Sequence, residues 1–148
     1  MPTLVARMVA ISSSILALDV GNKRIGVAIA SLASRLPSPF KTLDNDDKFL
    51  QNLQAIITAE NVETLVIGLP RGLDGQATDQ TSIVQAFVEQ LKTDVSLPTY
   101  FQDEALTSRK AEEELESRGK PYAKGDIDAL AATYILDDFL AEHKELVA

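Results

Sequence analysis

The chain has 148 residues, of which 45% are hydrophobic and 24% charged, with no cysteine and a formal net charge of −8. The lack of thiols excludes disulfides, zinc–thiolate centres and cysteine nucleophiles, and the acidity excludes nucleic-acid binding through a generally basic surface. A chain of this length suits one domain, and no segment has the roughly 18 consecutive apolar residues of a membrane span. We therefore expect a cytoplasmic globular protein in which any contact with nucleic acid is local.

The first half of the chain predicts three strands, a helix and a further strand. The first two strands are joined by a tight turn at β-hairpin spacing, and the third begins with proline, as edge strands can. These three strands span residues 15–20, 25–31 and 37–43. Apolar residues then recur at helical spacing over residues 46–61. The wholly apolar run at residues 64–69 is typical of a strand covered on both faces.

The second half predicts a loop, a helix, a strand, a helix, a polar loop and a last helix. Their ranges are residues 70–79, 83–91, 98–102, 107–116, 117–125 and 126–140. Strands alternating with helices after an initial hairpin indicate an α/β fold with a mixed sheet. We expect residues 1–14 to be an N-terminal extension, with Met8 as an alternative start, and residues 15–148 to form one domain.

Two carboxylates end predicted strands. Asp19 lies among apolar neighbours, where a carboxylate is costly to desolvate unless it is paired or binds a metal; alternatively, it supports the turn that follows. Glu104 ends the strand-like run PTYFQDE, at the strand terminus where ligands collect in α/β sheets. Alternatively, Glu104 and the adjacent Asp103 have a structural role, in which their negative charges compensate the dipole of the helix that begins at Thr107.

A third carboxylate is found from helical geometry. Asp128 shares a stripe with Ala131 and Ile135 at spacings of three and seven residues, so it lies on the face that packs against the sheet. Asp126 points outward instead and is interpreted as a helix cap. If Asp19, Glu104 and Asp128 converge, they form an all-oxygen site that suits Mg²⁺ or Mn²⁺. Two such ions could support phosphodiester cleavage, which is a nuclease mechanism.

Four segments, in order along the chain, resemble the YqgF (RuvX-like) family of the RNase H-like superfamily. They read LALDVGNKRIGVAIA, VIGLPRGLDGQ, FQDEALTSRKAEEEL and GDIDALAATYIL. Members of this family are described as Holliday junction resolvases and as pre-16S rRNA nucleases. The resemblance implies an RNase H-like fold, a mixed five-stranded sheet with flanking helices that begins with a three-stranded meander. It also implies that the metal ligands are Asp19, Glu104 and Asp128.

The resemblance suggests substrate contacts as well. Lys23 and Arg24 lie beside the carboxylates in sequence and could meet phosphate, although an ordinary solvated turn is the alternative. Further candidates for substrate binding are Arg71, in the loop after a strand, and Arg109. Two departures from the family pattern are expected to weaken nucleic-acid binding. These are Ala105, where many members have arginine, and Asp126, where a basic residue often stands.

The leading hypothesis is a cytoplasmic endonuclease that uses Mg²⁺ or Mn²⁺, as two ions, to process the 5′ side of precursor 16S rRNA. Its partners would be structured RNA and ribosomal or RNA-processing proteins. A second hypothesis keeps the mechanism and replaces the substrate with branched DNA, as in a Holliday junction resolvase. A third is a non-catalytic module that binds nucleic acid or acts as a scaffold. We expect no membrane partner, and we expect the chain to be a monomer or a homodimer, between which the sequence does not choose.

Overall fold

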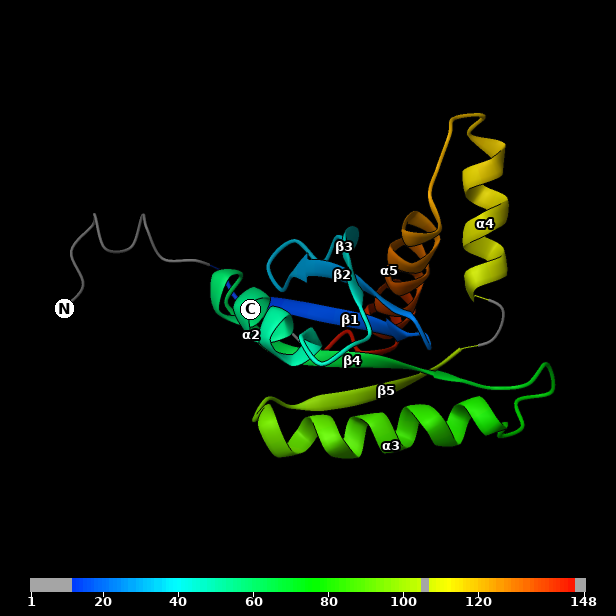
Figure 1. The fold of residues 1–148 in the computed structure, drawn as a ribbon. Helices are drawn as coiled ribbons and strands as arrows, with labels where there is room; N and C mark the ends of the chain where they lie inside the picture. The colour runs from blue at the N-terminus through cyan, green and yellow to red at the C-terminus, as the bar shows by residue number, and fades with distance from the viewer. Residues whose placement is uncertain (1–11, 105–106, 146–148) are drawn as a thin grey trace.

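A computed structural model describes residues 12–104 and 107–145 (Figure 1). The strands in this part of the chain are β1 (Ser14–Val20), β2 (Arg24–Ser31), β3 (Ser38–Asp44), β4 (Val62–Pro70) and β5 (Thr99–Glu104). The helices are α2 (Phe49–Ala59), α3 (Asp79–Asp94), α4 (Thr107–Ser117) and α5 (Lys124–Glu142). This order confirms the predicted α/β succession. Met8 and Ala105 lie outside the described residues.

The five strands form one mixed sheet in the order β3-β2-β1-β4-β5. The pairs β1–β2 and β2–β3 are antiparallel, which gives the predicted meander, whereas β1–β4 and β4–β5 are parallel. In this register Asp19 lies opposite Gly26, and Glu104 lies opposite Pro70. The carboxyl ends of β1, β4 and β5 therefore share one edge of the sheet, where a site was predicted.

Helices cover both faces of the sheet, as Figure 1 shows. Alternate β1 residues face opposite sides: Leu16 and Leu18 pack in the cluster of α2 and α3, whereas Ile15 and Ala17 pack against α5. This two-sided burial explains why residues 15–18 of the strand are all apolar. Helix α4 packs on α5 rather than on the sheet, through contacts that include Ala111. Within the described residues, no helix is long and apolar enough to cross a membrane.

Two helices begin earlier than the apolar periodicity predicts, because side chains cap their first turns. The Thr78 hydroxyl accepts a hydrogen bond from the Thr81 N–H, and the Thr81 hydroxyl accepts one from the Thr78 N–H, so α3 begins within the predicted loop. At α5, an Asp126 carboxylate oxygen accepts a hydrogen bond from the Ala123 N–H at 2.9 Å. The interpretation of Asp126 as a cap is therefore confirmed.

Candidate active site

Asp19 lies near the end of the central strand β1, on the face covered by α5. Its side chain lies on the same face of the strand as that of Ala17, two residues before it, and Ala17 packs against this helix. Burial and the negative charge of Asp128 raise the pKa of Asp19 from 3.8 to about 6. A half-buried carboxylate with a raised pKa beside a second carboxylate is a candidate for a functional group, because the protein leaves its charge uncompensated.

A glycine on β2 brings Asp128 close to Asp19. A Cβ atom at Gly26 would lie 1.9 Å from the backbone oxygen of Asp128, so any larger residue would push α5 away from the sheet. The sheet-facing position predicted for Asp128 is thus the observed one. Its Oδ2 atom accepts a hydrogen bond from Arg24 Nε at 2.7 Å, and the two side chains are 18% and 35% exposed, respectively. Because Arg24 compensates the negative charge of Asp128, Asp19 is the member of the pair whose charge has no such partner in the described part of the chain.

Glu104 ends β5, but its carboxyl group meets Asp138 in the second half of α5. Burial raises the pKa of Glu104 to about 9, with further contributions from a hydrogen bond to Asp138 and from the charges of Asp138 and Glu142; Lys110 opposes the shift. The Oε1 atom of Glu104 is buried and has no hydrogen-bond partner among the described residues. Glu104 and Asp138 are thus a second carboxyl pair, in which Glu104 keeps its proton at neutral pH.

The structure therefore brings together two of the three carboxylates that the sequence singles out. Within residues 12–104 and 107–145, no three acidic, histidine or cysteine side chains are arranged to hold a metal ion. The chemistry of the donors nevertheless fits a divalent cation. The Asp19–Asp128 pair lacks a full counter-charge, and the free oxygen of Glu104 belongs to a third candidate ligand. Metal binding by these residues remains a prediction.

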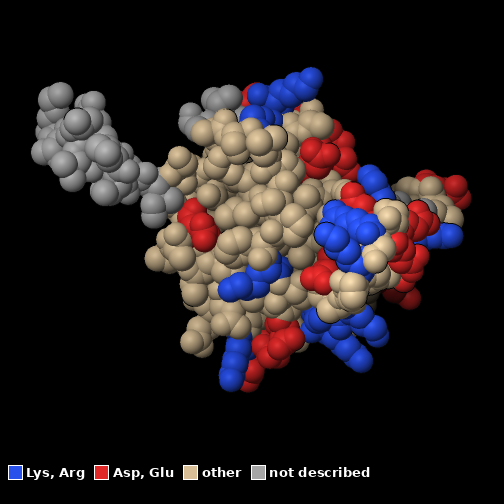
Figure 2. Space-filling model, turned by 90° about the horizontal axis from the view of Figure 1, so that it is seen from above, with Lys and Arg blue, Asp and Glu red and all other residues tan. Residues whose placement is uncertain are grey.

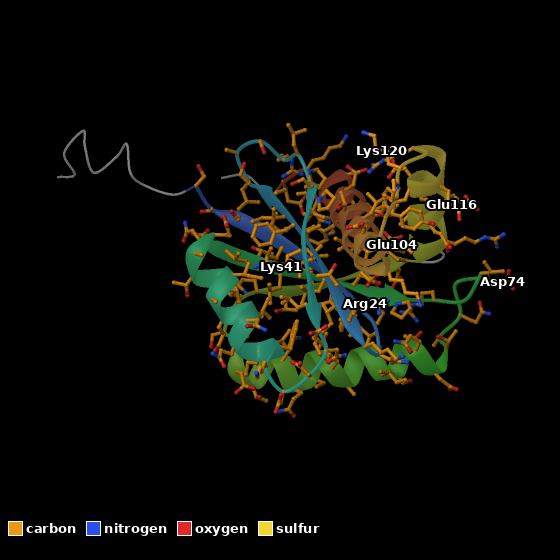
Figure 3. The ribbon with its side chains drawn as sticks, turned by 45° about the horizontal axis from the view of Figure 1, so that its top comes forward. Arg24, Lys41, Asp74, Glu104, Glu116 and Lys120 are labelled. Carbon is orange, nitrogen blue, oxygen red and sulfur yellow. The ribbon has the colours of Figure 1, made fainter. Side chains whose placement is uncertain are left out.

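The four predicted substrate-binding cations occupy different environments. Arg24, at the start of β2 (Figure 3), lies in the site through its bond to Asp128, and Lys23 is exposed in the adjoining turn. Arg71 follows β4, and its Nε atom lies 3.2 Å from Asp103 Oδ1. Arg109 Nε lies 3.6 Å from Glu113 Oε1 on its own helix, an exposed pair that is screened by solvent. Contact of these four residues with substrate stays a prediction.

Sequence reasoning missed Asp138, the residue that faces Glu104. A signal was present: Asp138 follows Tyr134 at a spacing of four residues, so the two share a helical face. Both belong to the side of α5 near α4, since the Tyr134 hydroxyl donates a hydrogen bond to Glu114 Oε2 at 2.6 Å. The side of a long helix that turns toward β5 depends on the angle at which the helix crosses the sheet, which periodicity does not give.

Comparisons with known proteins show the family and the fold of this chain. A family model described as "RuvX: Holliday junction resolvase" matches residues 13–142. A Crocosphaera subtropica protein named "Putative pre-16S rRNA nuclease" is 40% identical over 135 residues, which cover 88% of this chain and 94% of that protein. A Rickettsia felis protein of the same name is 34% identical over 139 residues, or 91% and 90% of the two chains. Thermus thermophilus RuvC, at 12% identity, shares the fold with a TM-score of 0.53 over 88% of this chain and 96% of its own.

Proposed function

This chain belongs to the RuvX family, and on that premise we propose that it is a phosphodiester endonuclease that processes the 5′ side of precursor 16S rRNA. The observation that carries the proposal is the half-buried pair of Asp19, at the carboxyl end of β1, and Asp128, on α5. Such a pair suits cleavage of a phosphodiester with the help of divalent cations. The choice of RNA rests on the names of the similar proteins from Crocosphaera subtropica and Rickettsia felis.

The proposed mechanism assigns separate roles to the side chains of the site. Asp19 is ionised above about pH 6, and it would hold Mg²⁺ or Mn²⁺, as one or two ions, together with Asp128. When bound, the cations supply positive charge that lowers the pKa of water and stabilises the leaving oxygen. Arg24 orients Asp128 through the 2.7 Å bond. Glu104 would join the ligands after its carboxyl group leaves Asp138.

Substrate phosphates would be bound by a few cations rather than by a basic surface. Figure 2 shows Lys and Arg side chains in separate groups over one face of the molecule, with Asp and Glu side chains among them. Lys23, Arg71 and Arg109 are the cations that we assign to this contact, with Lys23 nearest in sequence to the carboxylate pair. Because each phosphate contact releases counterions, the affinity for substrate should fall as the salt concentration rises. The slope of the logarithm of the binding constant against the logarithm of the salt concentration should be shallow, since few contacts are made.

A second candidate substrate is branched DNA, which the description of the matching family model favours. A resolvase cuts two strands symmetrically, so this activity would require a homodimer with two sites in register. The RNA reaction can be carried out by a monomer, alone or with ribosomal or RNA-processing partners. Processing of precursor rRNA would place the protein in the cytoplasm.

The test is cleavage of a precursor 16S rRNA fragment and of a synthetic four-way DNA junction, side by side, with Mg²⁺, with Mn²⁺ and with chelator. Asp19→Asn and Asp128→Asn should abolish metal-dependent cleavage. Asp137→Asn is the matched control, because Asp137 is exposed on the same helix. Cleavage of one substrate alone identifies that substrate. Full activity in Asp19→Asn, or no cleavage of either substrate by the folded parent protein, would contradict the proposed function.

A further inference from the structure

A second concave site lies between α4, the start of α5 and β3, and the sequence analysis assigned it no role. The cavity has a volume of about 270 Å³. Its floor is apolar and consists of Leu115, Ala129 and Leu130, each less than 9% exposed. Pro121 and Tyr122, from the loop between the two helices, form part of its wall. A cavity of this volume with an apolar floor suits a single planar ring rather than a larger ligand.

The rim of this cavity carries positive charge in an otherwise acidic protein. Arg118 and Lys120 line it and are exposed, and Figure 3 shows Lys120 where α4 leads into the loop. Arg118 contacts Glu114 at 3.3 Å, but both side chains are about half exposed, so this pair is weak and can exchange. Asp126 also lines the cavity, with one oxygen already bonded to Ala123 N–H. An anion would therefore bind near Lys120.

Tyr122 is positioned as a stacking surface. It is partly buried against the apolar cluster of α4 and α5, and its hydroxyl group contacts Glu116 Oε1 at 3.3 Å. These contacts restrain the ring while one part of it still lines the cavity. Aromatic side chains of this kind stack with unpaired bases whatever the base, because every base has a π-face.

The cavity is next to the candidate active site on the same helix. Asp128 turns toward the sheet, whereas Asp126 and Ala129, its near neighbours in sequence, line the cavity. The two sites are thus separated by about the diameter of one helix, roughly 10 Å with side chains. A strand with a phosphate at Asp19 and Asp128 could reach the cavity with a nearby unpaired nucleotide.

We propose that this cavity binds one unpaired nucleotide of the nucleic-acid substrate, close to the bond that is cleaved. The base stacks on Tyr122 over the apolar floor, and the phosphate contacts Lys120 and Arg118. This inference rests on the proposed function, and it adds that the substrate has a single-stranded segment beside the cleavage site. Recognition of splayed-out bases by aromatic side chains is the usual way in which proteins read unpaired RNA.

The test measures binding of a fluorescein-labelled single-stranded RNA oligonucleotide by fluorescence anisotropy, in chelator so that no cleavage occurs. Ala129→Leu fills the floor of the cavity, and Lys120→Gln removes one cation from its rim. We expect Ala129→Leu to weaken binding about tenfold, as the loss of one stacked base would. Lys120→Gln should weaken binding and lower its salt dependence. Ala141→Leu and Lys41→Gln, exposed positions outside the cavity, are the matched controls and should bind as the parent does.

The cleavage assay run on the same proteins separates this inference from the proposed function. Tyr122→Phe should keep parent affinity, whereas Tyr122→Leu should lose it, and thermal unfolding checks that each variant is folded. Parent-like binding by folded Ala129→Leu and Tyr122→Leu would overturn the cavity assignment, even if the parent protein cleaves RNA. If these variants bind weakly but the parent cleaves no substrate, the assignment of the cavity as a nucleotide site is supported and the nuclease proposal is contradicted. No binding of the oligonucleotide by the parent would also overturn the cavity assignment.

Discussion

Replacing Asp19 by asparagine should stabilise the metal-free protein, and the gain should depend on pH. Burial and the charge of Asp128 raise the pKa of Asp19 from 3.8 to about 6. The folded protein thus binds the proton of Asp19 more tightly than the unfolded protein does. The free energy of unfolding therefore includes the full contribution of this group below pH 3.8, and it loses that contribution as the pH rises through 6. The pKa change corresponds to about 3 kcal/mol above pH 6. Asparagine has nearly the same shape and carries no charge.

The assay is urea unfolding of the parent and of Asp19→Asn, with chelator, at several pH values between about 4 and about 8. The free energy of unfolding should be nearly equal in the two proteins near pH 4, and Asp19→Asn should be more stable by about 3 kcal/mol near pH 8. Asp137→Asn, an exposed control, should show no such trend. Added Mg²⁺ should stabilise the parent and reduce the difference. A difference that does not change with pH, or a less stable variant near pH 8, would refute the reasoning.

Three further substitutions test how the site is positioned. Gly26→Ala should push Asp128 away from the sheet, costing about 1–3 kcal/mol of stability and lowering cleavage sharply; parent-like activity would show that the close approach is unimportant. Thr81→Val should cost about 1–3 kcal/mol in urea unfolding, because it leaves the partly buried Pro70 carbonyl and the Thr78 N–H without their partner. Arg24→Met should lower the metal-free stability by about 1–2 kcal/mol near neutral pH, with less effect in acid; an equal loss at both pH values would mean that packing, not charge, is responsible.

The sequence by itself determined the order of the elements and the character of the central strand. Asp19 stands out because every neighbour of it on β1 is apolar, and that pattern follows from burial of the strand on both faces. The position of Asp128 on the sheet side of α5 follows from helical periodicity, and the cap at Asp126 follows from its place in the first turn. These are local properties, set by residues within a few positions of one another.

Only the tertiary structure decided which carboxyl groups meet. Asp19 and Asp128 are far apart in sequence, and they come together because the bare Gly26 lets α5 approach β2. The same helix brings Asp138 to Glu104, and the loop that follows helix α4 brings Tyr122 to the wall of the cavity. The angle at which a helix crosses a sheet results from side-chain packing along the whole interface, and no short segment of sequence contains that information.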